Sequence, residues 1–324
     1  MKIKNKLLLL LAIFTLIIPI NTLALTDKVI LGGENIGIEI DTNGILIVGF
    51  YEINNNSNIK NLKIGDRIIK VNDKDIDNID EMIDIIDNSK DKILKLTIIR
   101  NKKQIKTTLE LEYTNNVYKT GIYVKDKVVG IGTISYINPE TQTYAALGHE
   151  VIESYSNTKV EVKDGKIYSS DVTGIKKSTN HRTGEKEAKL NKELIYGNIE
   201  KNTISGIYGT YHGIYNQNEL IDVASKNDIH EGKAYIYTVI EKDKKEKFEI
   251  NIIKINQTSE TKNILFEITD KKLIQKTNGV IKGMSGSPII QDNKIIGAVT
   301  HAIQSKPNMG YGIFITTMLK EGEN

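Results

Sequence analysis

The chain has 324 residues, of which 39% are hydrophobic, so it is long enough for two or three packed domains. It contains no cysteine, which excludes disulfides, thiolate zinc sites and a cysteine nucleophile. The formal charge is +3, and it falls to 0 without the three lysines of residues 1–24, a segment with no acidic residue. Without residues 1–24 the chain has no excess of positive charge, so its net charge does not indicate nucleic-acid binding.

The first residues have the pattern of an export signal. A basic start, Met1–Lys6, precedes an apolar run from Leu7 to Ile20 and a small residue, Ala24. The run is short for a membrane-spanning helix of about 20 residues, although Leu23 to Leu25 could extend it. We therefore predict that residues 1–24 are either a cleaved signal peptide or a retained membrane anchor, and that the chain is exported across the cytoplasmic membrane.

A compact segment of mixed pattern follows, from about residue 29 to residue 112. Alternating residues at 36–40 predict a half-buried strand, and Asn43-Gly44 predicts a turn. Asn78 to Glu81 has the form of a capping box ahead of a helix whose apolar residues share one face. These patterns predict a small α+β domain.

The phrase LKIGDRIIKVND, residues 62–73, resembles the corresponding part of PDZ domains. In that family a peptide adds as a strand to a sheet edge, and main-chain N–H groups of a short loop hold its carboxylate. The resemblance places the peptide-binding loop at Ile36, Gly37 and Ile38. The alternative is that both isoleucines are ordinary core and that Gly37 is only a bend.

From residue 113 to residue 324, short alternating runs separated by turn residues predict strands. Helical periodicity is confined to the stretch from Glu187 to Glu193. About 210 residues of this kind fit a pair of six-stranded barrels. The expected fold is therefore mainly β, with a PDZ-like domain over 29–112 and a double β-barrel over 113–324.

The strongest functional signal is GVIKGMSGSPII, residues 279–290, with its return strand KIIGAVTH, residues 294–301. Glycines beside Ser285 permit backbone conformations closed to other residues and let a substrate carbonyl approach main-chain N–H groups. The pattern G-x-S-G-x-P resembles the nucleophile loop of chymotrypsin-like serine peptidases. The resemblance implies that Ser285 attacks and that the N–H groups of Gly283 and Ser285 form the oxyanion hole. A plain Gly/Ser turn in a hairpin is the alternative.

A serine nucleophile needs a base, and His149 is the candidate among five histidines. It follows small residues at a predicted strand end, although a lone histidine can also be structural. His301, on the return strand, is expected to line a pocket. Glu153 stands where the second histidine of an H-E-x-x-H zinc motif would be, so we expect no metal and no cofactor.

Residues 130–151 and 268–302, behind the PDZ-like segment and the apolar N-terminus, resemble in order and motif the stage IV sporulation protein B peptidases of endospore-forming bacteria. The resemblance implies a serine endopeptidase in the space between the forespore and mother-cell membranes. It implies that the enzyme cleaves itself and then a regulatory membrane protein of an intramembrane protease complex, which activates a late sigma factor. The partners expected are therefore protein substrates and the chain itself.

The same resemblance assigns Asp270, which precedes Ser285 by 15 residues (285 − 270), as the acid that orients His149. Asp171 and Asp222 are rivals, because an acid in this fold usually falls well before the nucleophile loop.

Three other functions compete with this one. A general quality-control protease places its catalytic domain before the PDZ domain, and this chain has the reverse order. A catalytically silent PDZ peptide-binding protein does not need the intact His, Asp and Ser set. A Ser–Lys dyad would use Lys282, which the loop pattern does not require.

Overall fold

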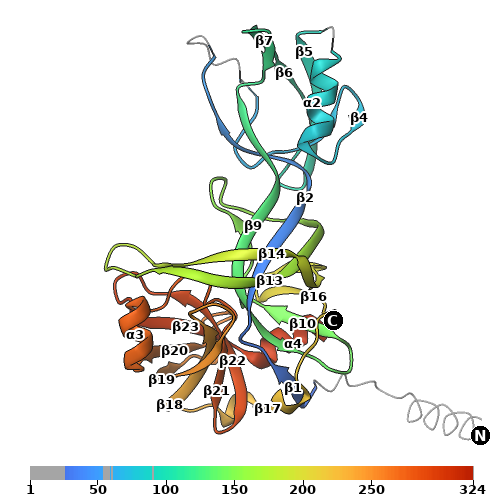
Figure 1. Ribbon diagram of the computed structural model, residues 1–324. Helices are drawn as coiled ribbons and strands as arrows, with labels where there is room; N and C mark the ends of the chain where they lie inside the picture. The colour runs from blue at the N-terminus through green and yellow to red at the C-terminus, as the bar shows by residue number, and fades with distance from the viewer. Residues whose placement is uncertain (1–25, 54–58, 60, 90, 324) are drawn as a thin grey trace, which may run out of the picture.

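The computed structural model describes residues 26–53, 59, 61–89 and 91–323 (Figure 1). The predicted signal peptide or anchor therefore lies outside the described residues. No helix in the described part of the chain is long and apolar enough to cross a membrane.

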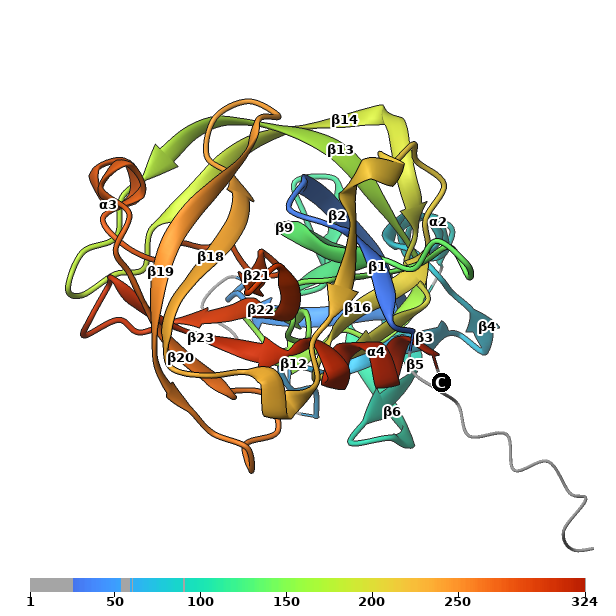
Figure 2. The same ribbon diagram turned by 90° about the horizontal axis from the view of Figure 1, so that it is seen from below.

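The C-terminal half of the chain forms a closed antiparallel barrel on the left of Figure 2. Its strands pair in the cyclic order β18, β19, β20, β23, β22, β21 and back to β18. The bounds are β18 Gly232–Val239, β19 Lys245–Ile255, β20 Ile264–Ile268, β21 Pro288–Gln291, β22 Lys294–Ala302 and β23 Met309–Phe314. Alternate residues point inward, so Ile236, Phe248 and Phe266 are buried in one core.

A second barrel lies beside the first. Its strands are β2 Asn35–Phe50, β9 Ile122–Ile137, β10 Thr143–Ala146, β13 Val162–Lys176, β14 Glu185–Asn198 and β16 Gly206–Thr210. Ladders join β14 to β13, β2, β9, β10 and β16 in that order. The ends of β14 and β16 meet where the His212 N–H donates to the Tyr196 carbonyl over 2.7 Å. The mainly β double-barrel prediction is confirmed.

Shorter elements link and cap the two barrels. Strand β1 pairs with β9 and β17, and β17 pairs in parallel with β22, which ties the barrels together. The remaining elements of this part are β1 Lys28–Leu31, β11 Ile152–Glu153, β12 Thr158–Lys159, β15 Lys201–Thr203, η1 Gln217–Glu219, β17 Leu220–Val223, η2 Lys226–Asp228, α3 Lys271–Thr277 and α4 Ile315–Glu323.

A separate α+β module stands above the barrels on β2 and β9 (Figure 1). Its elements are β3 Arg67–Val71, β4 Lys74–Asp75, α2 Ile79–Asp87, β5 Ile93–Arg100, β6 Lys103–Glu110, β7 Glu112–Thr114 and β8 Val117–Lys119. Helix α2 begins as predicted, because the Asn78 side chain accepts from the Glu81 N–H over 2.9 Å. Met82 and Ile86 of this helix pack on Ile68 and Leu94.

The domain boundary differs from the predicted one. Strand β2 runs unbroken for 16 residues, and its first half, with Ile36 and Ile38, packs in the barrel core against Ile134 and Leu147. The chain then enters the module and returns along β9. The module is therefore inserted between two barrel strands. Apolar alternation predicts a strand but does not say which core the strand enters.

The predicted peptide-binding loop at Ile36, Gly37 and Ile38 is wrong. These residues are paired on both sides, with β9 and with β13, and Ile36 and Ile38 are 0% and 2% exposed. A strand without a free edge cannot take up a peptide by strand addition. The alternative, that the isoleucines are core, is confirmed.

The segment from Glu187 to Glu193, with its helical periodicity, is part of strand β14. Its residues from Glu187 to Asn191 pair with β13, for example Lys189 with Asp171, with a register shift beside Glu187. Long hairpin pairing overrides the local pattern here.

We expect Gly37→Val to destabilise the barrel rather than to affect peptide binding alone. A Cβ at this position would lie 2.2 Å from Leu190 Cγ on β14, and overpacking of this kind costs about 1–3 kcal/mol. Chemical denaturation should show the loss, with hydrolysis of short peptides and proteins reduced together. Gly130→Val is the matched control, since a Cβ there meets nothing within 4 Å. Equal stability of the two variants would contradict this packing argument.

Candidate active site

Ser285 lies on a turn that only glycines can form. Gly283 and Gly286 have φ values of +93° and +94°, which residues with a Cβ rarely adopt. A Cβ on Gly286 would lie 1.9 Å from the carbonyl oxygen of Thr133. The turn is therefore pressed against strand β9 of the other barrel, and the glycines predicted from the motif have the expected conformational role.

Thr133 holds this turn through two hydrogen bonds and is joined to the segment after β10 by a third. Its N–H donates to the Ser285 carbonyl over 2.9 Å, and its hydroxyl donates to the Gly283 carbonyl over 2.8 Å. Its own carbonyl accepts from the Leu147 N–H over 3.3 Å. Thr133 thus ties the nucleophile turn to the end of β10. Sequence reasoning missed this residue, because a threonine in a strand has no signal of its own.

The chain turns sharply between β10 and His149. Leu147 and Gly148 both have positive φ, +71° and +68°, and a Cβ on Gly148 would lie 2.9 Å from Thr300 Cγ2. The imidazole of His149 lies beside that of His301 on β22, with ring centroids 5.3 Å apart. The structure therefore brings the segments carrying the predicted base and nucleophile to one junction between the barrels.

His149 is arranged to act as a neutral base. Its Nδ1 lies 2.8 Å from the Glu150 carbonyl oxygen, and since a carbonyl can only accept, Nδ1 must carry the proton. Nε2 is then free to accept a proton from a serine. Burial lowers the pKa of His149, which keeps the imidazole neutral at physiological pH.

The Ser285 hydroxyl donates to the Thr300 carbonyl over 3.0 Å. Its hydrogen is therefore directed at main chain, and proton transfer requires the hydroxyl to turn toward His149. Catalytic hydrogen bonds often align only when substrate is bound.

The two N–H groups of the predicted oxyanion hole are free among the described residues, and the hole itself stays a prediction. In the described part of the chain, the N–H groups of Gly283 and Ser285 donate to no other residue. One of these free amides belongs to the nucleophile itself and the other lies two residues before it, so both are available to a developing oxyanion.

The structure does not bring Asp270 to His149. Asp270 is the N-cap of helix α3, and its carboxylate accepts from the Leu273 N–H over 2.9 Å. The main-chain carbonyl of Glu150 occupies the position of the orienting group on Nδ1. The prediction that Asp270 orients His149 is therefore corrected: in this structure Asp270 caps helix α3. Spacing along the chain does not determine which carboxylate faces the base.

Neither rival carboxylate takes this place. Asp171 is exposed on β13, and Asp222 forms a surface ion pair with Lys28 over 2.8 Å.

We expect Asp270→Asn to keep peptidase activity within a few-fold of the parent chain, because asparagine caps a helix as well as aspartate does. Asp270→Ala should cost about 0.5–2 kcal/mol of stability through the lost cap. Urea denaturation and peptide hydrolysis on the same preparations check this. A folded but inactive Asp270→Asn chain would restore Asp270 as the acid of a triad.

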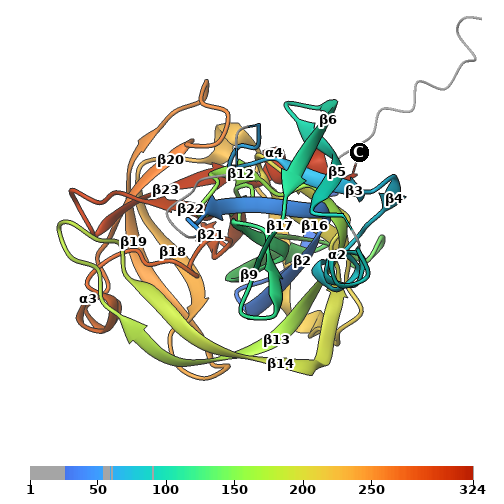
Figure 3. The same ribbon diagram turned by 90° about the horizontal axis from the view of Figure 1, so that it is seen from above.

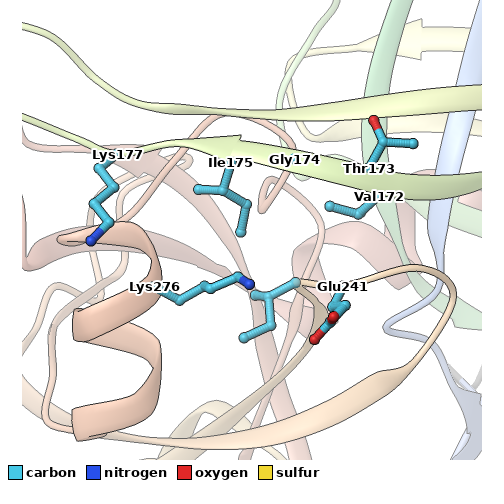
Figure 4. Close-up of a pocket in the computed structure, with 8 residues that line it drawn as sticks. Val172, Thr173, Gly174, Ile175, Lys177, Glu241 and Lys276 are labelled. Atoms are coloured by element: carbon cyan, nitrogen blue, oxygen red, sulfur yellow. The ribbon is translucent and has the colours of Figure 1, made fainter.

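The imidazole of His301 lies beside that of His149 and is uncharged at neutral pH. Burial, with the nearby His149, lowers the pKa of His301 to about 4, and its Nδ1 has no hydrogen-bond partner in the described part. The prediction that His301 lines a substrate pocket remains a prediction. A pocket that the structure does show lies elsewhere, where β13 passes over the other barrel (Figure 4); it is lined by Val172, Thr173, Gly174, Ile175, Lys177, Ile240, Glu241 and Lys276.

Paired antiparallel barrels that carry a serine and a neutral histidine at their junction are typical of chymotrypsin-like serine peptidases, hydrolases of peptide bonds. Comparison with known protein families identifies the particular family of peptidase. Residues 116–319 match the family SpoIVB peptidase S55, and the chain belongs to it. No curated protein matches the chain. The predicted family and enzyme class are confirmed, whereas the PDZ resemblance of the module stays a prediction, because the match begins at residue 116 and leaves out all but the last strands of the module.

Proposed function

We propose that this chain is a signalling peptidase that cleaves itself and then a regulatory membrane protein of an intramembrane protease complex. That cleavage would release the protease that activates a late sigma factor. The observation that carries the proposal is the membership of the SpoIVB peptidase S55 family together with a partly buried His149 beside the Ser285 turn, with its Nδ1 held by the Glu150 carbonyl. In this proposal the chain is exported and acts between the forespore and mother-cell membranes, with residues 1–24 as signal or anchor.

The module offers a way for a partner to affect the active site. Strand β9 begins in the module, where Val124 pairs with Ile47, and continues into the barrel, where Thr133 holds the Ser285 turn. One strand therefore joins a binding module to the nucleophile.

Peptide binding by the module would use an edge other than the one predicted. The stretch of β2 inside the module is paired on one side with β3 and on the other with β9, and β9 runs beside α2, whose Ile79 N–H donates to Asp126 over 2.9 Å. Strand β6 pairs only with β5 among the described strands. The module stretch of β9 likewise pairs only with β2 among the described strands. We therefore propose that a strand-adding peptide pairs with one of these two edges, β6 or the edge of β9 beside α2.

Intact mass measured over time tests the proposal. The chain without residues 1–24 should shorten at a few discrete bonds, and the Ser285→Ala chain should stay intact until a trace of active chain is added. The exported domain of the regulatory membrane protein should then be cut once or a few times by the active chain only. Cleavage of an unfolded protein such as casein into many fragments would favour general quality control. Absence of any cleavage would favour a silent binding protein.

A further inference from the structure

Lys186 is a charged residue inside the protein, close behind the nucleophile turn. It lies near the tip of the β13–β14 hairpin, which reaches from its own barrel over the β18–β23 barrel (Figures 2 and 3), and it is 3% exposed. Its neighbours Glu185 and Glu187 point outward, where both form ion pairs with Lys176. Strand alternation therefore turns Lys186 inward.

The ammonium group contacts three uncharged acceptors from three strands. Nζ lies 3.1 Å from Asn35 Oδ1 on β2, 3.1 Å from Thr238 Oγ1 on β18 and 3.5 Å from Thr133 Oγ1 on β9. In the described part of the chain no carboxylate pairs with it. An unpaired buried lysine is costly and is typical of functional sites.

Lys186 also contacts the oxyanion loop directly. Its main-chain N–H donates to the Lys282 carbonyl over 3.0 Å, and a Cβ on Gly283 would lie 2.9 Å from Lys186 Cδ. The Thr133 hydroxyl has one hydrogen, which it donates to the Gly283 carbonyl, so this hydroxyl accepts from Lys186. A chain of hydrogen bonds thus runs from the ammonium group through Thr133 to Gly283.

We propose that Lys186 is a positioning residue of the peptidase: through Thr133 it holds the Gly283–Ser285 loop with its N–H groups toward the substrate, and its charge lies behind the oxyanion. Lys186 does not act as the base that deprotonates Ser285. Its Nζ donates to Asn35, Thr133 and Thr238, and the Ser285 hydroxyl donates to the Thr300 carbonyl. While Lys186 is protonated, its positive charge in a dry site stabilises an oxyanion far more than it would in water. The proposal rests on the serine peptidase activity and adds a residue to it.

Lys186→Met tests the proposal, with Lys189→Met as the control on the exposed face of the same strand. Replacing an unpaired buried charge by an apolar side chain of similar length should leave stability unchanged or raised. We expect kcat to fall roughly 10²-fold, as for loss of one oxyanion donor, with KM nearly unchanged. A fluorophosphonate that labels Ser285 counts the folded sites, so that a lower folded fraction is not mistaken for a lower rate.

Thr133→Val provides a second, independent variant, because it removes the relaying hydroxyl at constant volume. It should lower kcat in the same direction, and the double variant should lose little more than the worse single one, since both break one chain of contacts. Full kcat in either folded variant, or fully additive losses, would overturn the proposal. If Lys186→Met does not fold, the kcat of Thr133→Val by itself supports or overturns the proposal.

The pH profile tests the charge itself. Burial lowers the pKa of Lys186 to about 7, and the groups that face Nζ from β2, β9 and β18 are the uncharged Asn35, Thr133 and Thr238. The positive charge is therefore present below about pH 7 and lost above it. We expect kcat to decline from pH 7 to pH 9 in the parent chain and to be flat over this range in Lys186→Met. Parallel profiles would overturn the electrostatic part of the proposal.

Discussion

Ser285→Ala and His149→Ala should each abolish peptide hydrolysis, with kcat lowered by factors of about 10⁴ to 10⁶. The Ser285 side chain is partly exposed on the turn, whereas that of Ser287 is fully buried. The protonated Nδ1 of His149 leaves Nε2 as the base. Without the base the hydroxyl keeps its proton, which it donates to the Thr300 carbonyl. Single-turnover hydrolysis of a fluorogenic peptide measures the loss.

Ser287→Ala is the matched control for the nucleophile. Ser287 lies two residues further along the same loop, fully buried, and its hydroxyl has no hydrogen-bond partner in the described part. This variant should keep its activity, and all three chains should melt cooperatively. Near-normal hydrolysis by Ser285→Ala or His149→Ala would refute the assignment of nucleophile and base.

Gly286→Ala should have the next largest effect. The added Cβ would meet the Thr133 carbonyl oxygen at 1.9 Å and the Leu147 nitrogen at 2.5 Å, at a φ of +94°. Both contacts are main chain and cannot rotate away, so the turn must separate from the strand that leads to His149. We expect a loss of roughly 1–3 kcal/mol from backbone strain and a fall in kcat of more than about 10²-fold from misplacement of the nucleophile.

Fluorophosphonate labelling and thermal melting of Gly286→Ala separate these two effects. Gly130→Ala is the control, since a Cβ there meets nothing within 4 Å, and it should match the parent chain in both measurements. A Gly286→Ala chain that is labelled at the parent rate would show that the turn tolerates a Cβ and that its contact with Thr133 does not position Ser285.

Several elements could be predicted because their signals are local. The turn around Ser285 depends on two glycines within four residues, and the start of α2 depends on Asn78 and Glu81, three residues apart. The alternating runs after residue 113 predicted strands for the same reason, since inward and outward positions follow directly from the pleat.

Other assignments failed because they depend on contacts between distant parts of the chain. Ile36 and Ile38 were assigned to a binding loop, and only their pairing with both β9 and β13 shows that they are barrel core. Asp270 has the spacing of an acid, yet its carboxylate is taken up by the N-terminus of α3. Spacing limits how far a side chain can reach but does not set its direction.

The sequence by itself determined the family, the serine nucleophile turn and the mainly β class, because a glycine-flanked serine and strand alternation act over a few residues. Only the tertiary structure decided that the module is inserted between β2 and β9, that a main-chain carbonyl orients His149, and that Lys186 is buried behind the oxyanion loop. Lys186 stands between Glu185 and Glu187, and its neighbours along the chain give no sign of its burial. Its burial follows from the register of β14 on β13 and from the crossing of that hairpin over the β18–β23 barrel, and no local pattern specifies either one.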